Sequence, residues 1–581
     1  MGATMPIYKI RPIRDLKDIL EQSAKLFGSK NAFLVKSGID GNYEGITYLK
    51  FKEDVEALGT ALISLGLRDK FIAVIGENRY EWCVSYLAVV NGTGIVVPLD
   101  KELPASEIEN LLTRSNASAV IFSGKFSELM KSLPGKLPTL KYYINMDASE
   151  DETPGSDVSE TVFLSFRSLV EKGKSFLAAG DRSFIDAPVD AEKMSILLFT
   201  SGTTDKAKGV MLSHKNICFN MQSVCSVLYI DSTDSVLSIL PLHHTYECTC
   251  GFLAMIYNGC TISFNEGLKH IAKNLQETKP SIIILVPLIL ENMYKKIWNQ
   301  ASKKPGLKIK LKAAIFISNF LLNAFKVDIR KKLFKQIHDN IGGNVRLIIS
   351  GAAAINPEVS KGLRAFGFKV RQGYGLTECS PIVTVNHDEV FKDDSIGKPL
   401  PGVEVKIENL DENGIGEITV KGDNVMLGYF GDPEGTQNVL KDGWFYTGDL
   451  GTADNEGFFY ITGRKKNVIV TKNGKNIYPE ELEVCLNKSP YIFESLVWGK
   501  DEEDSDETIV CSKIVPDFEA IKTRLGTDNF TESDVRKIIS EEIKAVNRNL
   551  PLFKRIRDFS IKEEEFAKTT TRKIKRYMEN K

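Results

Sequence analysis

A run of hydroxyls, glycines and lysines at residues 199–209, FTSGTTDKAKG, has the composition of a polyphosphate-binding loop. The apolar residues from Ile196 to Phe199 come directly before the polar part, so we expect a strand that leads into a loop. Backbone N–H groups, hydroxyls and a lysine in such a loop can surround phosphate oxygens. The spacing differs from the G-x-x-x-x-G-K-[ST] pattern of a Walker loop. Taken alone, the run is equally well explained as a polar turn.

Two further runs offer groups that suit a nucleotide. The run SGAAA at residues 350–354 consists of small residues, which let a flat ring approach the backbone. The run QGYGLTE at residues 372–378 contains Tyr374, which can stack on a base, and Thr377, which can bond a phosphate. The carboxylate of Glu378 in the same run is a suitable ligand for Mg²⁺.

Three runs toward the C-terminus add charged groups. The run YTGD at residues 446–449 ends in Asp449, whose carboxylate can accept hydrogen bonds from two ribose hydroxyls. The run GRKKN at residues 463–467 supplies Arg464 beside an expected domain boundary, with a surface ion pair as the alternative explanation. The run TTRKIKR at residues 570–576 contains Lys573, which taken alone is most simply a solvated side chain.

Short apolar runs that alternate with helical stretches must position these groups. Several of the runs lack polar residues, as is typical of parallel strands that are covered on both faces. The pattern predicts a doubly wound α/β architecture with more than one sheet. The expected strands are Phe71–Ile75, Ile95–Val97, Ala119–Phe122, Ile282–Val286 and Val345–Ile349.

From Gly402 onward the pattern changes to short strands and glycine turns, such as Val403–Ile407 and Gly416–Val420. This predicts a smaller β-rich subdomain, which we set at about residues 395–463. Beyond residue 464 we expect a compact α+β segment with strands at Ser495–Trp498 and Thr508–Ile514 and a helix near Ser533–Val546.

The composition excludes several classes of protein. A chain of 581 residues should form more than one domain, and its net charge of -1 argues against a surface that binds nucleic acid. The nine cysteines contain no C-x-x-C pair, so we expect reduced thiols in a cytoplasmic protein and neither disulfides nor a zinc site. The N-terminus lacks the apolar region of a signal peptide, and no apolar run reaches the roughly 20 residues that span a bilayer. The sequence indicates no particular oligomeric state.

A basic segment at residues 303–335 contrasts with the nearly neutral net charge of the whole chain. It holds ten lysines and arginines and one acid, Asp328, around the apolar stretch from Leu311 to Phe325. Such a segment can lie on an anionic membrane surface, which indicates peripheral membrane association. The alternative is a surface helix whose apolar face packs on the body of the protein.

In this order and spacing, the six runs resemble the adenylate-forming superfamily, which comprises acyl-CoA synthetases, adenylation domains of peptide synthetases, and luciferases. The resemblance covers essentially the whole chain. It is closest to the long-chain fatty acyl-CoA synthetases, because PLHHTYE at residues 241–247 looks like their Pro-Leu-x-His-x-aromatic-Glu segment. The basic insertion before Val345 is also similar to theirs.

The resemblance implies a large N-terminal domain at residues 1–463, made of α/β subdomains and the β-rich subdomain, that binds AMP, ATP and the acyl group. A small mobile domain at residues 464–581 would carry the catalytic lysine. The implied reaction joins a long-chain fatty acid to coenzyme A through an acyl-adenylate. It consumes ATP and requires Mg²⁺. The products are acyl-CoA, AMP and pyrophosphate.

The resemblance also implies a role for each matching residue. Lys573 would contact the carboxylate and the α-phosphate, Glu378 would hold Mg²⁺, and Lys466 would be the hinge of the small domain. His244 would lie near the acyl carboxylate, although a buried structural histidine explains it equally well. Gly474 and Lys475 would line the path of coenzyme A. The residues implied to bind ATP or AMP are Thr200, Ser201, Gly202, Thr203, Thr204, Lys208, Gly351, Ala352, Gln372, Gly373, Tyr374, Gly375, Thr377, Asp449 and Arg464.

The chain departs from the family pattern at three positions. The family usually has Gly, Pro and Gly where this chain has Asp205, Ala207 and Arg572. These changes leave the principal lysines in place, so they bear on affinity and rate more than on the class of reaction.

Other functions stay open at this point. The same adenylation could serve an acyl-carrier-protein thiol or an aryl acid, because pocket depth cannot be read from the sequence. A catalytically silent nucleotide or acyl binder would have no need of Lys573. A membrane scaffold built on the basic segment would show no ATP-dependent chemistry.

Overall fold

The computed structural model describes residues 4–38, 41–152, 161–200, 207–471, 475–501, 508–569 and 574–579. The chain divides into two compact units. Unit 1 comprises Met1–Glu404 and Lys421–Trp444, and unit 2 comprises Val405–Val420 and Phe445–Lys581.

One of the two large sheets of unit 1 has eight strands in the order β19-β9-β8-β4-β3-β5-β6-β7. Its strands from β8 to β7 are parallel, while β9 runs antiparallel to both β8 and β19. The strands are β3 (Phe71–Ile75), β4 (Ile95–Leu99), β5 (Ala119–Phe122), β6 (Tyr142–Asn145), β7 (Val162–Ser165), β8 (Met194–Thr200), β9 (Lys208–Ser213) and β19 (Gly428–Tyr429).

The other large sheet has nine strands in the order β16-β15-β14-β13-β12-β10-β11-β1-β2. The strands from β14 to β1 are parallel, and β2, β15 and β16 add antiparallel edges. The strands are β1 (Asn31–Lys36), β2 (Tyr43–Thr47), β10 (Ser235–Ser238), β11 (Thr261–Phe264), β12 (Ile282–Leu285), β13 (Leu347–Ser350), β14 (Lys369–Gly375), β15 (Ile382–Val385) and β16 (Lys398–Pro399).

Every residue of β5, β12 and β13 is buried, which explains why these strands read as uninterrupted apolar runs. The helices that connect the strands have one buried face. In α1, for example, Leu16, Ile19, Leu20 and Ala24 are buried, and the side chain of Asp15 caps the helix by accepting a hydrogen bond from the N–H of Asp18.

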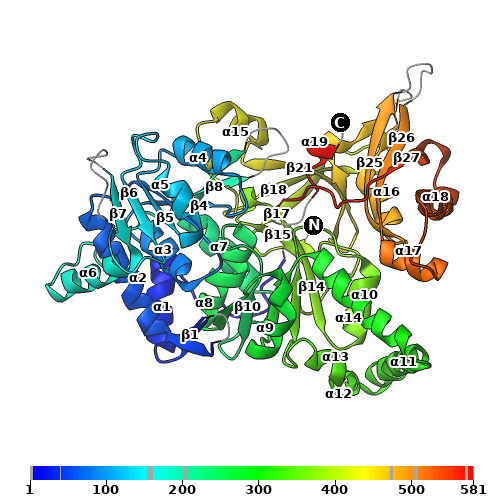
Figure 1. Ribbon diagram of the computed structural model, residues 1–581, viewed down its shortest axis with the longest axis horizontal. Helices are drawn as coiled ribbons and strands as arrows, with labels where there is room; N and C mark the ends of the chain where they lie inside the picture. The colour runs from blue at the N-terminus through cyan, green and yellow to red at the C-terminus, as the bar shows by residue number, and fades with distance from the viewer. Residues whose placement is uncertain are drawn as a thin grey trace. The chain divides into compact units, whose positions relative to one another are not determined.

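The remaining elements of unit 1 are mostly helices, and α10 to α13 lie together at one end of the nine-stranded sheet (Figure 1). The helices are α1 (Leu16–Phe27), α2 (Tyr48–Ser64), α3 (Tyr80–Val90), α4 (Ala105–Arg114), α5 (Ser127–Lys131), α6 (Phe166–Ala178), α7 (His214–Cys225), α8 (Ala254–Asn258), α9 (Ile271–Thr278), α10 (Pro287–Lys303), α11 (Leu307–Phe325), α12 (Arg330–Leu333), α13 (Lys335–Asp339), α14 (Pro357–Ala365) and α15 (Pro433–Val439). Short helical turns are η1 (Gly124–Phe126), η3 (Leu268–His270) and η4 (Thr377–Cys379), and η2 (Tyr246–Leu253) is a π-helix.

Unit 2 combines small sheets with three longer helices and short helical turns. The strands β17, β18, β21 and β22 form one sheet in the order β17-β18-β21-β22, and β25-β26-β27 form a separate sheet. The capping box of Thr531 and Asp534 starts α18, which buries Val535, Ile538 and Ile539. The elements are β17 (Glu404–Glu408), β18 (Gly416–Lys421), β21 (Trp444–Ala453), β22 (Phe459–Arg464), η5 (Lys465–Asn467), β23 (Ile469–Val470), β24 (Asn476–Ile477), α16 (Pro479–Leu486), β25 (Ile492–Asp501), β26 (Thr508–Pro516), α17 (Phe518–Leu525), α18 (Glu532–Arg548), η6 (Leu552–Lys554), β27 (Ile556–Ile561) and α19 (Arg576–Glu579). The short strand β20 (Leu440–Lys441) belongs to unit 1.

The expected α/β class is confirmed, and each strand expected in the first two-thirds of the chain is present. One differs in position, because β13 occupies Leu347–Ser350 and Val345 precedes it as a buried residue outside the ladder. The boundary at residues 463 and 464 and the mobility of the smaller domain remain predictions. Among the described residues, no helix is both long and apolar enough to cross a membrane.

Candidate functional site

The strands β8 and β9 fix both ends of the expected phosphate loop. Thr200 and Lys208 are register partners at the open end of this antiparallel pair, and the Thr200 hydroxyl donates to the Lys208 carbonyl at 3.4 Å. The carbonyl of Ala207 accepts a hydrogen bond from Arg114 at 2.8 Å. Ser201, Gly202, Thr203, Thr204 and Asp205 lie outside the described residues. The loop therefore starts at a hydroxyl and ends at a cation, which are held across from each other.

The ammonium group of Lys208 lies over an aromatic ring. Its Nζ is 4.4 Å from the ring centroid of Tyr429, within the range of a cation–π contact. Tyr429 belongs to β19, which pairs with β9 so that Tyr429 is opposite Val210. The short strand β19 thus places the ring beside the lysine.

The same tyrosine holds the carboxylate of Glu378. Tyr429 Oη donates to Glu378 Oε1 at 2.9 Å. Burial of the phenol and the negative charge of Glu378 both raise the pKa of Tyr429, so the phenol keeps its proton and remains a donor. One residue therefore positions a cation by its ring and a carboxylate by its hydroxyl.

The backbone around Glu378 is tied to neighbouring segments. Its carbonyl accepts a hydrogen bond from the N–H of Met426 at 2.8 Å. The side chains of Asn220 and Asn424 both donate to the carbonyls of Cys379 and Ile382. These contacts fix η4 and the start of β15, and with them the direction of the Glu378 side chain.

Lys208, Thr200 and Glu378 fit a metal-bound polyphosphate. The lysine and the hydroxyl suit phosphate oxygens, whereas a carboxylate next to them would repel a phosphate unless a cation lay between. A carboxylate oxygen is the ligand that Mg²⁺ prefers, and Mg²⁺ commonly joins one or two carboxylates to substrate phosphates. The chemistry of this donor set thus matches the expected magnesium.

Small residues follow β13 where the flat ring of a base was expected. A Cβ on Gly351 would come within 2.8 Å of the Tyr246 ring, so the position admits only glycine. Ala352 has a left-handed backbone with a φ of 71°, an uncommon conformation for alanine. The Gln372 side chain accepts from Ile355 N–H at 2.7 Å and donates to Ser395 at 2.8 Å. Gln372 therefore links this loop to β14, and a role in nucleotide binding remains a prediction.

The aromatic residue of the QGYGLTE run is mostly inside the protein. Tyr374 lies on β14 and is 8% exposed, so only a small part of its surface is open to a stacking base. Gly373 and Gly375 flank it, and a Cβ on Gly375 would lie 1.9 Å from the Pro381 carbonyl. The glycine at 375 therefore permits the close approach of β14 and β15. Thr377 begins η4 directly after this strand.

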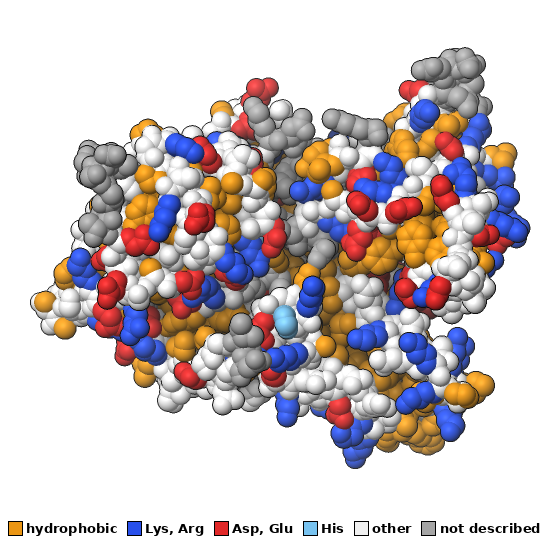
Figure 2. Space-filling model, viewed as in Figure 1, with side chains coloured by type: hydrophobic (Ala, Val, Ile, Leu, Met, Phe, Trp, Pro, Cys, Tyr) orange, Lys and Arg blue, Asp and Glu red, His pale blue; other side chains and the backbone are white. Residues whose placement is uncertain are grey.

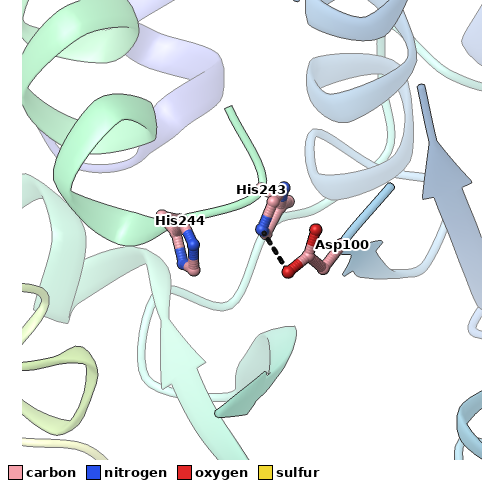
Figure 3. A group of neighbouring side chains, drawn as sticks. All are labelled: Asp100, His243 and His244. Atoms are coloured by element: carbon pink, nitrogen blue, oxygen red, sulfur yellow. Dashed lines mark ion pairs between the residues drawn. The ribbon is translucent and has the colours of Figure 1, made fainter. Parts of the chain in front are cut away.

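Two histidines and an aspartate form a cluster between η2 and the end of β4. His243 Nε2 lies 3.5 Å from Asp100 Oδ2, and the two imidazole rings have centroids 4.1 Å apart (Figure 3). Burial alone would raise the pKa of the Asp100 carboxyl, but His243 and the charge of His244 outweigh it and hold this pKa well below its usual range. Asp100 thus fixes His243, and His243 lies beside His244. Potential ligand atoms of the three residues lie within 4.8 Å of one another.

The glutamate of the PLHHTYE run points into the core. Glu247 is 1% exposed, and its Oε1 accepts a hydrogen bond from Ser238 at 2.6 Å. Asn78 donates to the same Ser238 hydroxyl at 2.9 Å and to the Leu240 carbonyl at 2.7 Å. Burial raises the pKa of Glu247 to about 8, although the bond from Ser238 lowers it. Glu247 therefore belongs to a buried polar network that holds the end of β10.

In unit 2, Asp449 and Arg464 are paired with each other. They are register partners on β21 and β22, and Arg464 Nε lies 2.6 Å from Asp449 Oδ1. Asp449 N–H donates to the Thr447 hydroxyl at 3.0 Å. The carboxylate has about four lone-pair positions, so the pair with Arg464 leaves capacity for further donors. The same pair is compatible with a ribose site and with a purely structural contact.

The expected hinge residue, Lys466, is exposed and has charged neighbours. Partial loss of hydration and the positive charges of Arg464 and Arg576 together lower the pKa of Lys466 to about 8, against the opposing effect of Glu480 and Asp449. Its neighbour Asn467 donates to Glu480 at 2.6 Å. Lys475 lies with its Nζ 4.7 Å from the Phe553 ring centroid. Gly474 and Lys573, like Arg572, lie outside the described residues.

Three residues of this site escaped the sequence analysis. Tyr429 contacts the predicted residues Lys208 and Glu378 directly. Asn220 donates to the carbonyl of Cys379, which follows Glu378, and Asp100 pairs with His243, which precedes the predicted His244. Only Tyr429 carries a local signal, since an aromatic between glycine turns at 428 and 431 indicates a constrained position. The other two come close to the site only through the fold.

Comparison with known proteins gives a consistent result. The model of a family described as AMP-binding enzyme matches residues 20–430. Long-chain-fatty-acid–CoA ligase 5 of Rattus norvegicus is 31% identical over 561 residues, which cover 90% of this chain and 80% of that protein.

Solved structures share the fold over nearly the whole chain. An anthranilate CoA ligase in complex with anthranoyl-AMP has a TM-score of 0.76 at 20% identity and covers 98% of this chain and 97% of its own. The o-succinylbenzoate coenzyme A synthetase of Bacillus subtilis in complex with ATP and magnesium has a TM-score of 0.71 at 20% identity, covering 97% of this chain and 99% of its own.

Proposed function

This chain belongs to the family of AMP-binding enzymes, and we propose that it is an ATP-dependent long-chain fatty acid–CoA ligase. In the first step a fatty carboxylate attacks the α-phosphorus of ATP and gives an acyl-adenylate and pyrophosphate. In the second step the thiol of coenzyme A attacks the acyl carbon, AMP leaves, and acyl-CoA forms. The choice of a long-chain acid draws support from the ligase of Rattus norvegicus, which is 31% identical.

The observation that carries this proposal is the arrangement of Lys208, Tyr429 and Glu378 in unit 1. A lysine over the ring of Tyr429 and a carboxylate on its hydroxyl are fixed next to each other. This pairing has an evident use when a triphosphate and a divalent metal bind together. A silent acyl binder would gain nothing from it.

The first step brings two anions together, so charge neutralisation is the main task. Lys208 and Thr200 would bind phosphate oxygens from the two ends of the loop. Glu378 would hold Mg²⁺, which when bound supplies positive charge to the phosphate oxygens. Lys573 is the residue that we propose to contact both the carboxylate and the α-phosphate.

The remaining parts of ATP need a ring surface and hydroxyl acceptors. We assign the adenine to Tyr374 with Gly351 and Ala352, and the ribose hydroxyls to Asp449. Arg464 would orient the Asp449 carboxylate through their 2.6 Å contact. His244 would lie near the acyl carboxylate, with His243 and Asp100 as positioning residues behind it.

The second step requires room for coenzyme A. We propose that the C-terminal domain turns about Lys466 after adenylation, which removes Lys573 and brings Gly474 and Lys475 to the thiol. A cytoplasmic location, expected from the cysteines, belongs to the same proposal.

Acid-dependent release of pyrophosphate from Mg·ATP tests the function. The assay uses a panel of short, long-chain and aryl acids, each without a thiol, with coenzyme A, and with an acyl-carrier protein, and the thioester is identified by mass. We expect release with long-chain acids and a thioester only with coenzyme A. If a thioester formed only with the carrier protein, the acceptor would be that protein and not coenzyme A. If aryl acids were preferred, the substrate would be an aryl acid and not a long-chain fatty acid. No release with any acid would refute the proposal.

A further inference from the structure

Helix α11 is apolar on both of its sides. On the inner side, Leu311, Ala314 and Ile315 pack against the core around β12 and β13. The outer side is exposed, whereas the outer side of a surface helix normally carries polar residues. The outer residues and their exposed fractions are Ile309 (74%), Phe316 (75%), Ile317 (52%), Phe320 (57%) and Phe325 (63%).

The outer apolar residues form one continuous stripe. Residues 309, 313, 316, 317 and 320 recur at spacings of three and four, so they share one face of the helix. No charged residue occurs from Ala313 to Phe325, and the rings of Phe320 and Phe325 contact each other edge to face at 6.0 Å. At about 1.5 Å per residue the stripe from Ile309 to Phe320 is about 17 Å long. Figure 2 shows apolar side chains gathered in this region, with basic side chains around them.

Lysines surround the stripe. Lys308, Lys310 and Lys312 lie in the first two turns of α11, and Lys326 follows its last residue. Cations near a helix N-terminus are unfavourable for the helix, because the N-terminal end carries the positive end of the dipole. The position of Lys308, Lys310 and Lys312 therefore does not serve the stability of α11.

The described part of the protein offers these lysines no ion-pair partner. Asp328 is the only acid among residues 303–335, and it pairs with Arg330 at 2.6 Å. Among the residues that the structure describes, none of the lysines at 303, 304, 308, 310, 312, 326, 331 and 332 forms an ion pair. The positive charge around the stripe is available to an external anion.

We propose that this surface, the α11 face (Ile309, Phe316, Ile317, Phe320 and Phe325 with Lys308, Lys310, Lys312 and Lys326), binds an anionic lipid bilayer. The aromatic and aliphatic side chains would enter the boundary between headgroups and acyl chains, and the lysines would contact lipid phosphates. The helix lies in the plane of the membrane, because no described helix is able to cross one. The net charge of the chain is -1, so the attraction arises from this local cluster and not from overall charge.

A second copy of the chain fits the face less well. Two copies paired through a twofold axis would bring their lysine clusters toward each other, which costs binding energy. Lysine is also depleted at the centres of protein interfaces. The proposal is independent of the catalytic assignment, since lipid binding is measured without substrate.

Vesicle flotation of the full chain tests the proposal. We expect binding to vesicles of phosphatidylcholine with phosphatidylglycerol, weak binding to phosphatidylcholine alone, and a loss of binding as salt rises. The triple variant Lys308→Glu, Lys310→Glu, Lys312→Glu should bind anionic vesicles about a hundredfold more weakly, since each lysine contributes about fivefold. Phe316→Ser with Phe320→Ser should weaken binding at least about tenfold.

Matched controls separate the face from general surface effects. The triple variant Lys136→Glu, Lys172→Glu, Lys269→Glu changes the net charge by the same amount at exposed lysines elsewhere on unit 1. The double variant Leu26→Ser, Leu268→Ser removes leucines that are 58% and 52% exposed. Both controls should bind vesicles like the unaltered protein.

Three results would overturn the proposal. The first is no binding of the unaltered protein to anionic vesicles at low salt, a measurement that needs no variant. The second is an equal loss in the control and α11 triple variants. The third is a dimer in light scattering that Phe316→Ser with Phe320→Ser converts to a monomer, which would assign the face to a second copy.

Discussion

Two glutamates of unit 1 occupy opposite surroundings. Glu378 lies on the short turn η4 near the surface, with one oxygen held by Tyr429 at 2.9 Å. Glu247 lies inside the π-helix η2 at 1% exposure, with a pKa raised to about 8 by burial. Both belong to runs that stand out in the sequence. The difference teaches that the residue type marks a position as special, while the surroundings decide whether the carboxyl can bind a cation or must support the core.

The largest effect should come from removal of Lys208, the cation that shares Tyr429 with Glu378. Lys208→Ala should lower acid-dependent pyrophosphate release by about 10²- to 10³-fold, because a preorganised charge at the phosphates is lost. Lys215→Ala is the matched control, since Lys215 is a nearby surface lysine paired with Glu192 and Asp423. Equal activity of the two variants would show that Lys208 does not take part in the reaction.

Removal of the buried carboxyl should instead affect stability. Glu247→Ala leaves a cavity and takes away the hydrogen-bond partner of Ser238, so we expect a loss of about 2–4 kcal/mol in unfolding free energy. Glu378→Ala should change the thermal midpoint little. Thermal unfolding of both variants checks this contrast, and the reverse order of stabilities would contradict it.

The protonation of Glu247 should make the stability of the protein depend on pH. Its pKa in the folded protein is about 8 against an ordinary 4.5, so the folded state keeps a proton that the unfolded state loses between these values. This contribution to stability is complete below pH 4.5 and is lost as the pH rises to about 8, by at most about 1.4 kcal/mol per pH unit. Glu247→Gln should therefore show a flatter dependence of the apparent Tm on pH. Parallel curves for the variant and the unaltered protein would show that Glu247 is charged in the core.

The smallest effect should come from removal of the hydrogen bond that Tyr429 donates to Glu378. Tyr429→Phe keeps the ring under Lys208 but removes the hydrogen bond to the carboxylate, so we expect a loss in rate of about three- to tenfold. Tyr429→Leu also removes the ring and should cost more. If Phe and Leu at this position gave the same rate, the contact between Lys208 and the ring would have no part in catalysis.

The sequence predicted the strands of unit 1 well, because β3, β5 and β12 are buried on both faces and read as apolar runs. It also singled out the runs that contain Lys208 and Glu378, whose roles remain predictions. It did not predict Tyr429 or Asn220, since their partners are 51 and 162 residues away in the chain and are brought close only by β19 and α7. The burial of Glu247 was equally hidden, because a glutamate beside two histidines gives no local sign of the core network formed with Ser238 and Asn78.

Glu378 is the proposed metal ligand, whereas the buried Glu247 has no part in metal binding. The most direct test is the rate of acid-dependent pyrophosphate release as a function of free Mg²⁺ for Glu378→Gln and Glu247→Gln beside the unaltered protein. We predict that Glu378→Gln lowers the rate and needs more Mg²⁺ for half-maximal activity, while Glu247→Gln keeps the Mg²⁺ dependence of the unaltered protein. An unchanged Mg²⁺ requirement in Glu378→Gln, or a raised one in Glu247→Gln, would contradict the account.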